Sequence, residues 1–520
     1  MVKKRGIVIC DFGSQYTLLI ARKLRELGFY AELVNGTEQS VPDHIEPEGI
    51  ILSGGPDGVN DQGARMIPAW VSDSGLPVLG ICYGMQLLVS SEGGELHSGR
   101  KKEFGKASIR FNKDAQNTPA GNLFKGQAPE SQMVVWMSHG DHVDKLPESL
   151  VPLAYSDEGI IAAIAHREKP WMGFQFHPEV HHSPMGGELL SLFAEGLCRC
   201  VRNWNPTTMV DEISKRLQSE ISSDERVLLA VSGGVDSSVA ALLLTKALGP
   251  ERVDCVFVDH GMLRKNEGRD VAKMLRSLGL NLEVLHREEA FLSALQGLSD
   301  PEDKRKTIGQ LFIQCFEEHA SGKDYTHLGQ GTLYPDVIES AGHGSGSHVI
   351  KSHHNVGGLP ERLALKLIEP FRYLFKDEVR VIGRELGLPD EMTRRHPFPG
   401  PGLAVRIPGE VSKEKVAILQ QADEIYINSL REAGYYEKIW QAATILLPVK
   451  SVGVMGDQRT WQWACVLRAV TGVDAMTAEA SDLPVEFLST VARKIVQQVD
   501  GINRVLYDVT SKPPATIEWE

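Results

Sequence analysis

The chain has 520 residues, and its 68 acidic and 55 basic residues give a formal net charge of −13 at pH 7. This acidic balance argues against a broad surface for nucleic acid or anionic membranes, but it allows a local basic pocket for small anions. The length predicts about three or four domains, and the seven scattered cysteines favour a reducing compartment. Because no apolar stretch is long enough for a signal-peptide core or a membrane span, we expect a soluble cytoplasmic protein.

The first 200 residues alternate short apolar runs with helical patterns. Leu and Ile recur at helical spacing from residue 14 to residue 27, where Gly28 ends the pattern. A second helical pattern at residues 188–201 ends before Asn203, where we place a domain boundary. The alternation predicts an open α/β sheet with functional loops at the strand ends. The expected strands are residues 6–10, 31–34, 49–52, 77–81 and 171–176.

Cys82 follows one of these strands in the run Gly-Ile-Cys-Tyr-Gly, a cysteine version of the nucleophile elbow. A small buried cysteine is the alternative interpretation of this residue. A thiol needs a base to become the nucleophilic thiolate. His177 follows another strand and could activate Cys82, while Glu179 orients and charges its ring. The pairing of these two strand ends favours nucleophilic catalysis.

A third strand is followed by Ser-Gly-Gly-Pro at residues 53–56, whose free backbone N–H groups, with that of Tyr83, could form an oxyanion hole. Together these motifs resemble the class I glutamine amidotransferases over about residues 5–200. The resemblance implies a triad of Cys82, His177 and Glu179. It also implies that the oxyanion and the glutamine are bound by Gly54, Gly55, Tyr83 and Gln86.

Two stretches leave the details of this pocket open. At Asp57-Gly58 the chain departs from the family, which usually has a serine here, so the shape of the loop is not predicted. Residues 138–141, Ser-His-Gly-Asp, resemble a family segment that borders the substrate pocket, but a plain loop histidine is an equal alternative for His139.

Two groups of possible metal ligands are not predicted to bind metal. Cys198 and Cys200 have only His181 and His182 nearby, and no zinc spacing is completed. Four histidines lie among glycine, serine and asparagine without helical spacing, which predicts a mobile loop instead. These are His343, His348, His353 and His354.

The run at residues 232–238 follows an apolar strand at 227–231 and precedes helix-forming residues at 239–244. In such a strand, turn and helix, two glycines let backbone N–H groups approach an anion, and the helix N-terminus adds partial positive charge. Asp236 would repel a bare phosphate unless a divalent cation lay between them, so the loop predicts a phosphate bound with Mg²⁺. A serine-capped turn that binds nothing is the alternative. The candidate ligands are Ser232, Gly233, Gly234, Val235, Asp236, Ser237 and Ser238.

This loop has no Gly-Lys-Ser or Gly-Lys-Thr, which excludes a Walker A motif. Its Ser-Gly-Gly-x-Asp-Ser pattern resembles the pyrophosphate loop of the N-type ATP pyrophosphatases, which adenylate an oxygen of their substrate. Strands at 252–258 and 282–285, with a helix at 267–278 between them, predict a second α/β unit around the loop. Lys376, just before a further helix, could reach the ATP phosphates, although a solvated lysine is the plainer interpretation.

Four segments of the second half, residues 330–336, 352–358, 395–403 and 512–520, are together similar to the GMP synthetase family. With the amidotransferase in front, the resemblance covers essentially the whole chain. It implies conversion of xanthosine monophosphate (XMP), ATP and glutamine to GMP, AMP, pyrophosphate and glutamate. It places Lys376 on a lid over pyrophosphate, and it assigns XMP to Arg264, Gln441, Lys512, Glu518 and, more weakly, Arg406.

The predicted organisation has three α/β domains in a short, homodimeric form of the family. The amidotransferase spans residues 1–203 and the ATP pyrophosphatase 204–396, both with open parallel sheets. A small C-terminal domain at 397–520 would bind XMP and form the dimer. The alternatives are another glutamine-dependent ATP pyrophosphatase, such as an NAD synthetase or a tRNA-modifying amidase, or a nucleotide-sensing protein with inactive sites. The segment at 512–520 argues against the first, and intact Cys82, His177, Glu179 and Asp236 argue against the second.

Overall fold

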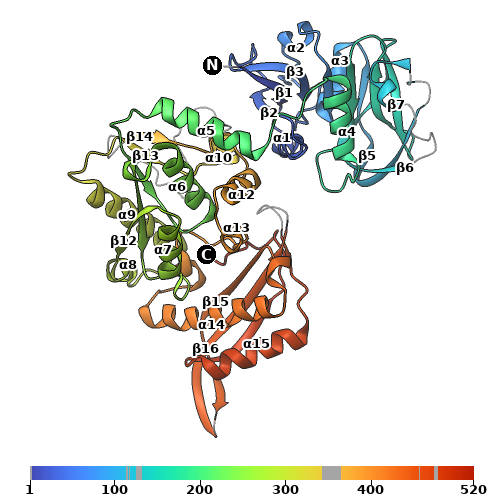
Figure 1. The fold of residues 1–520 in the computed structure, drawn as a ribbon. Coiled ribbons are helices and arrows are strands. Elements are labelled where there is room, and N and C mark those ends of the chain that lie inside the picture. The colour runs from blue at the N-terminus through green and yellow to red at the C-terminus, as the bar shows by residue number, and fades with distance from the viewer. Residues whose placement is uncertain are drawn as a thin grey trace. The chain divides into compact units, whose positions relative to one another are not determined.

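A computed structural model describes residues 3–112, 115, 117–124, 132–341, 365–455, 457–472 and 478–520. The four histidines from His343 to His354, predicted to lie in a mobile loop, fall outside these residues, as does the segment 352–358. The chain divides into two compact units, Met1–Asn205 and Pro206–Glu520 (Figure 1). Within the part of the chain that the structure describes, every helix is too short or too polar to cross a bilayer.

The first unit is built on a nine-stranded sheet in the order β2-β1-β3-β4-β9-β8-β7-β5-β6. Its first five strands are parallel, and the remaining pairs are antiparallel. These parallel strands are buried over most of their length, as expected for a sheet whose two faces are covered by helices. The expected open α/β sheet is therefore confirmed, and the strand before Cys82 lies in its interior. The strands are β1 (Lys4–Asp11), β2 (Ala31–Asn35), β3 (Ile45–Leu52), β4 (Val78–Ile81), β5 (Glu95–Phe111), β6 (Gln132–Lys145), β7 (Leu150–Ser156), β8 (Ile161–His166) and β9 (Trp171–Phe174).

The helices of this unit match the sequence pattern at the start of the chain better than at its end. The helix expected at 14–27 is α1, and Gly28 follows it with φ +91°, a conformation that glycine adopts without strain. The helix expected at 188–201 is wrong in length, since it changes to a π-helical turn and ends at Leu197, after which Arg199 has φ 58°. The helical segments are α1 (Thr17–Glu26), α2 (Ala69–Asp73), α3 (Tyr83–Ser91), η2 (Gly121–Phe124), α4 (Gly186–Ser191) and η3 (Leu192–Leu197).

The second unit contains a five-stranded parallel sheet in the order β12-β11-β10-β13-β14. The chain leaves the central strand β10 toward β11 on one side and later returns to β13 on the other. Ligands of open α/β sheets bind at such a switch point, outside the carboxyl ends of the strands. The strands are β10 (Val227–Ala230), β11 (Val253–Asp259), β12 (Asn281–His286), β13 (His327–Gly329) and β14 (Lys366–Ile368).

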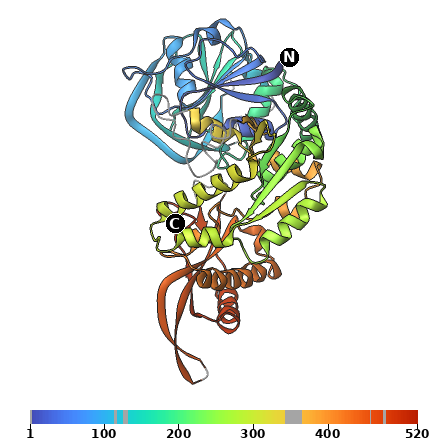
Figure 2. The ribbon, with the colours of Figure 1, turned by 90° about the vertical axis from the view of Figure 1, so that its left-hand side faces the viewer.

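A smaller mixed sheet follows, in which β15 and β16 form a long hairpin and β18 pairs parallel with β16. Both ribbon views show this hairpin extending beyond α14 and α15 (Figures 1 and 2). Its strands are β15 (Gln441–Met455), β16 (Gln458–Thr471), β17 (Glu479–Ala480) and β18 (Ile502–Asp508). The helical segments of the whole unit are α5 (Pro206–Glu220), α6 (Val235–Leu248), η4 (Pro250–Arg252), α7 (Glu267–Ser277), α8 (Glu288–Leu295), α9 (Pro301–Ala320), α10 (Tyr334–Ala341), α12 (Lys376–Glu385), α13 (Asp390–Thr393), η5 (Gly402–Arg406), α14 (Lys413–Glu432), η6 (Tyr436–Lys438) and α15 (Val485–Gln498).

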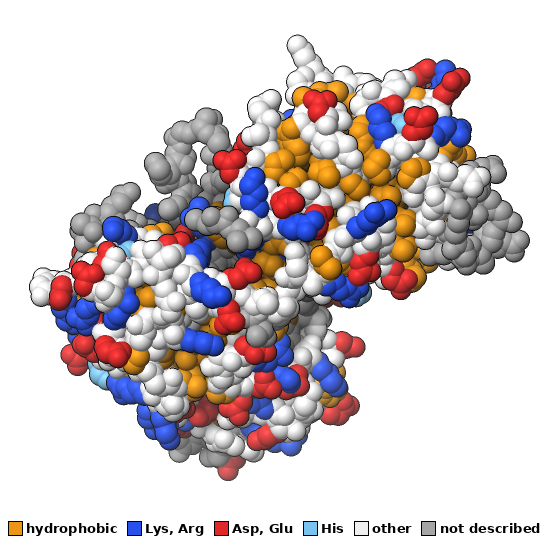
Figure 3. Space-filling view, turned by 45° about the horizontal axis from the view of Figure 1, so that its top comes forward, with side chains coloured by type: hydrophobic (Ala, Val, Ile, Leu, Met, Phe, Trp, Pro, Cys, Tyr) orange, Lys and Arg blue, Asp and Glu red, His pale blue; other side chains and the backbone are white. Residues whose placement is uncertain are grey.

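One hydrophobic core joins the two sheets of the second unit. Val256 of β11, Leu419 of α14, Leu467 of β16 and Ile495 of α15 belong to the same cluster of buried side chains. This shared core explains why Pro206–Glu520 is one compact unit, whereas its division at residue 396 stays a prediction. Figure 3 shows Lys and Arg interspersed with Asp and Glu over the face that it draws, so this face carries no large patch of one charge sign.

We expect Leu419→Ala to destabilise both sheets of the second unit together, by about 2–5 kcal/mol, because it empties part of a shared core. The measurement is amide hydrogen exchange in β11 and β16 of the full chain, with Leu506→Ala as control, since Leu419 is fully buried and Leu506 is 44% exposed. If protection falls in β16 alone, the two sheets are separate folding units.

Candidate functional site

Cys82 lies at a strained turn between β4 and α3. Its backbone has φ 52° and ψ −106°, a conformation that costs a non-glycine residue about 1–3 kcal/mol. The flanking glycines permit this turn: a Cβ on Gly84 would lie 2.2 Å from the Leu52 carbonyl oxygen, and one on Gly80 would lie 2.5 Å from the Gly84 backbone. The Cys82 N–H donates to the Phe174 carbonyl of β9 at 2.7 Å. The local sequence therefore aims the thiol at the end of β9, where His177 follows.

His177 and Glu179 form a buried pair beside the thiol. The Nδ1 atom of His177 lies 2.7 Å from Oε1 of Glu179, and both residues are almost fully buried. Burial alone would lower the pKa of His177, but the charge of Glu179 and hydrogen bonds to Cys82 and Glu179 raise it to about 10. The ring is then an imidazolium at neutral pH, which is the state that stabilises a neighbouring thiolate. The structure thus brings the predicted triad together.

The glycine loop after β3 packs against the same residues. A Cβ on Gly54 would lie 3.5 Å from Cε1 of His177, and one on Gly55 would lie 3.1 Å from the Tyr83 ring. Tyr83 is the first residue of α3, so its N–H has no acceptor within the helix. Asp57, at the departure from the family pattern, pairs with Arg65 at 2.9 Å, while the Arg65 carbonyl accepts from the Tyr83 hydroxyl at 2.6 Å. The loop is thereby tied to the helix that follows Cys82.

The predicted glutamine-binding residue Gln86 is turned toward the protein. The side-chain amide of Gln86 donates to the Asp141 carbonyl at 3.1 Å, and Gln86 is only 4% exposed. It therefore positions the segment 138–141, whose Ser138 carbonyl lies 3.8 Å from the Cys82 sulfur. His139 contacts the Asp141 carbonyl at 3.0 Å and lies 3.6 Å from Glu103, and its burial lowers its pKa. Ser138 is thus the member of this segment that reaches the thiol.

Two neighbours of the triad were not predicted from the sequence. The Gln175 amide nitrogen lies 3.8 Å from the Cys82 sulfur, and the Tyr16 ring packs edge-on against His177 at 5.0 Å between ring centroids. Gln175 could have been found, because it precedes His177 by two residues at a strand end and so points to the same side. Tyr16 has no such signal, since only folding brings the start of α1 to this place.

The serine and glycine loop at residues 232–238 joins β10 to α6. Gly233 has φ +78° and Gly234 caps the helix, so the backbone turns sharply at the carboxyl end of the central strand. The two serine hydroxyls of Ser232 and Ser237 lie 3.1 Å apart, and that of Ser238 donates to the Gly234 carbonyl at 2.8 Å. The helix N-terminus is left facing outward, as an anion site requires.

Asp236 and Lys376 meet at this loop. The Lys376 ammonium lies 3.3 Å from Oδ2 of Asp236, and Oδ1 of Asp236 is buried and has no hydrogen-bond partner among the residues that the structure describes. Among the described residues no cluster of three metal-ligating side chains occurs. A single carboxylate oxygen with phosphate oxygens is nevertheless how Mg²⁺ is commonly held beside nucleotides. The unpartnered Asp236 oxygen therefore fits the predicted ion.

Three of the residues assigned to the acceptor nucleotide form one polar cluster. Arg406 is fully buried and binds Glu518 through two hydrogen bonds of 3.0 and 2.9 Å, and the Gln441 amide donates to the same carboxylate at 2.5 Å. The guanidinium of Arg406 also faces Asp423 at 3.8 Å. Arg406 is therefore fully enclosed in these contacts, and its guanidinium holds the Glu518 carboxylate.

Arg264 lies at the edge of this cluster, whereas for Lys512 the contact is made by its backbone. Arg264 donates to the Ala442 carbonyl at 3.2 Å, faces Asp423 at 3.4 Å, and shares the Phe398 ring with Arg406. The Lys512 backbone forms an isolated bridge with Ala478. The sequence did not indicate Asp423, and it indicated Phe398 only as a member of the segment 395–403, because the partners of both residues lie elsewhere in the chain.

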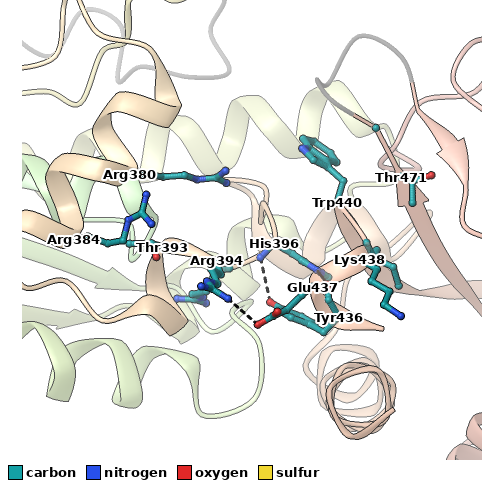
Figure 4. A pocket seen from close by; sticks show the side chains of 13 residues that line it. Arg380, Arg384, Thr393, Arg394, His396, Tyr436, Glu437, Lys438, Trp440 and Thr471 are labelled. Atoms are coloured by element: carbon teal, nitrogen blue, oxygen red, sulfur yellow. Dashed lines mark hydrogen bonds and ion pairs between the residues drawn. The ribbon is translucent and has the colours of Figure 1, made fainter. Parts of the chain in front are cut away.

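A basic pocket of about 490 Å³ lies beside the loop within the same unit (Figure 4). Figure 4 shows Arg380 and Arg384 of α12 on one side of it and Lys438 and Trp440 on another. Arg395, which also lines it, donates to the Gly233 carbonyl at 3.2 Å. Its positive charge would raise the local concentration of anionic nucleotides near the loop.

Comparison with known proteins agrees with this division of sites. The family model described as Glutamine amidotransferase class-I matches residues 8–197, that of NAD synthase matches residues 207–309, and that of the GMP synthase C terminal domain matches residues 428–519. Fold and site thus define a glutamine amidotransferase joined to an ATP-pyrophosphatase-type unit.

Similar proteins narrow this class to one family. The glutamine-hydrolyzing GMP synthase of Aquifex aeolicus is 50% identical over 523 residues, covering 100% of both chains. That of Wolinella succinogenes is 52% identical over 520 residues, covering 99% of each, and that of Rhizobium etli is 50% identical over 528 residues, covering 99% of this chain and 98% of its own. The chain belongs to the family of glutamine-hydrolyzing GMP synthases.

We expect Glu179→Gln to slow alkylation of Cys82 by iodoacetamide at pH 9. Loss of the carboxylate charge lowers the pKa of His177 from about 10 toward neutral pH. At pH 9 less imidazolium is then present to stabilise the thiolate, and the alkylation rate falls about twofold or more. The measurement is the pH profile of alkylation, with Cys82→Ser as the blank for the other cysteines, which are all buried. An identical profile in the variant would show that Glu179 does not charge the ring.

Proposed function

We propose that the chain converts XMP to GMP with ammonia taken from glutamine, after adenylating XMP with ATP. One observation carries this proposal: the chain contains two sites, each at the carboxyl end of a parallel strand. The first combines a thiol, an imidazolium and a carboxylate, and the second is a loop suited to phosphate. The products are GMP, AMP, pyrophosphate and glutamate. Full-length similarity to the glutamine-hydrolyzing GMP synthases supports the pairing of the two chemistries.

In the first unit, the Cys82 thiolate attacks the carboxamide carbon of glutamine. Backbone N–H groups of the Gly54-Gly55 loop and of Tyr83 stabilise the oxyanion that forms. The His177 imidazolium protonates the departing ammonia, and the neutral ring then activates the water that hydrolyses the thioester to glutamate. Glu179 keeps the ring oriented through its 2.7 Å contact with Nδ1. The Ser138 carbonyl, beside the sulfur, is available to the carboxamide NH₂ group.

In the second unit, the C2 oxygen of XMP attacks the α-phosphorus of ATP and pyrophosphate leaves. Residues 232–238 hold the phosphates at the N-terminus of α6, and Lys376 neutralises negative charge beside them. Asp236 would hold Mg²⁺, which would supply positive charge against the negative charge of the phosphates. Ammonia then attacks C2 and AMP leaves, which is a better leaving group than an oxide.

For the acceptor nucleotide, we assign the phosphate to Arg264 or Lys512 and the purine edge to Gln441 and Glu518. An amide and a carboxylate together offer the donors and acceptors that a purine edge needs, while arginine and lysine suit a phosphomonoester. The clustering of Gln441 and Glu518 at 2.5 Å supports a shared role. Arg406 contributes by holding Glu518.

The match of residues 207–309 to NAD synthase keeps another ATP pyrophosphatase as the second candidate. It would use the same loop but a different acceptor. The match of residues 428–519 to the GMP synthase C terminal domain favours XMP.

We further propose that the protein is a cytoplasmic homodimer whose two copies meet along the β15–β16 hairpin. Val452 of β15 and Trp461 of β16 are cross-strand neighbours and are 50% and 62% exposed, and Val449 and Val454 are exposed as well. Exposed apolar side chains that meet across a hairpin suit contact with a second copy of the same hairpin.

The test compares Cys82→Ala with Asp236→Asn in assays that supply either glutamine or ammonium. We expect Cys82→Ala to lose glutamine-dependent GMP formation by several orders of magnitude, as removal of a nucleophile does, yet to retain ammonium-dependent formation within about twofold, because the sites lie in different units. Asp236→Asn should lose both activities and keep Cys82 open to alkylation. Equal loss of both activities in Cys82→Ala would contradict the division of labour.

A further inference from the structure

A fully buried lysine lies under the acceptor cluster and belongs to no motif. Lys304 of α9 is 0% exposed, and burying an ammonium is costly unless it is fully hydrogen bonded. Its Nζ donates to the carbonyls of Ala404, Ile407 and Gly409 at 3.3, 3.0 and 2.9 Å and pairs with the Glu520 carboxylate. The lysine is thereby completely satisfied by two segments that are far from it in sequence.

The same two segments, residues 404–409 and the stretch that ends at Glu520, contain Arg406 and Glu518. The carbonyls bound by Lys304 lie on both sides of Arg406, and Glu520 lies two residues beyond Glu518. The second oxygen of Glu520 accepts from the Gly409 N–H at 3.1 Å, and the Glu520 backbone carbonyl accepts from Arg305. Lys304 and Glu520 therefore fix the distance between the backbone that carries Arg406 and the backbone that carries Glu518.

We infer that Lys304 is a positioning residue for the acceptor nucleotide, acting with Glu520 to hold Glu518 in place. The inference rests on the proposed function, in which Glu518 and Gln441 meet the purine edge. Lys304 does not touch the nucleotide, because its ammonium is enclosed by the four oxygens of its own chain. A displacement of about 1 Å in a binding group costs on the order of 100-fold in rate, so a loosened pair would be visible in kinetics.

The experiment is steady-state kinetics of the full chain with saturating ammonium, varying XMP and ATP separately. We expect Lys304→Met to raise the KM for XMP about 10- to 100-fold, to leave the KM for ATP within about twofold, and to leave Cys82 alkylation unchanged. Lys306→Met is the matched control, since Lys306 is an exposed lysine of the same helix. It should behave as the unchanged protein.

Two further variants separate the possible failures. Lys304→Met leaves the Glu520 carboxylate buried and unpaired, so adding Glu520→Gln should recover part of the XMP affinity. If Glu518→Gln raises the KM for XMP and Lys304→Met does not, the positioning role is overturned while the proposed site stands. If Glu518→Gln has no effect on that KM, the proposed acceptor site itself is wrong. Two other results would overturn the inference by making the pair purely structural. In the first, Lys304→Met raises the KM values for ATP and XMP in parallel. In the second, neither Lys304→Met nor Glu520→Gln folds.

Discussion

Both chemical sites depend on one backbone constraint, a sharp turn from the carboxyl end of a buried parallel strand into the N-terminus of a helix. At Cys82 the turn forces a left-handed φ of 52° on a side-chain-bearing residue, and at Gly233 a φ of +78° falls on glycine. At the first turn a neighbouring glycine lets backbone approach backbone, since any Cβ on Gly84 would lie only 2.2 Å from the Leu52 carbonyl oxygen. The helix N-terminus then faces outward and favours negative charge, whether a thiolate with its oxyanion or a row of phosphates.

Carboxylates that orient another side chain differ from Asp236, the carboxylate proposed to bind the metal ion, in how fully a cation of the protein balances their charge. Glu179, Glu518 and Glu520 are each matched to a buried or nearly buried cation, so their charges orient His177, Arg406 and Lys304. Asp236 is the contrast, because one of its oxygens meets Lys376 and the other has no hydrogen-bond partner among the described residues. An unsatisfied carboxylate oxygen is costly in the protein alone, and a metal ion held with the phosphates would remove that cost.

The sequence predicted those features that depend on short local patterns, namely apolar strands and the glycine turns that follow them. Apolar runs followed by glycine turns predicted the open α/β sheets, which the structure confirms, and the positions of Cys82, His177 and the loop at 232–238. Tertiary partners such as Tyr16, Asp423 and Lys304 could not be predicted, because they acquire their roles only when distant segments pack. The helix expected at 188–201 ends early at Leu197, since hydrophobic periodicity does not detect a change to a π-helical turn. Arg406 was expected to touch the ligand, but its complete burial with Glu518 favours a supporting place.

The central claim is that the loop at 232–238 serves adenylation of the acceptor oxygen, so that ammonia displaces AMP. The most direct measurement uses XMP labelled with ¹⁸O at C2, with ATP and ammonium, followed by mass spectrometry of the products. The account predicts that one ¹⁸O atom appears in the phosphate of AMP for each GMP formed, and none in pyrophosphate. Release of the label in pyrophosphate or in water, with unlabelled AMP, would contradict it.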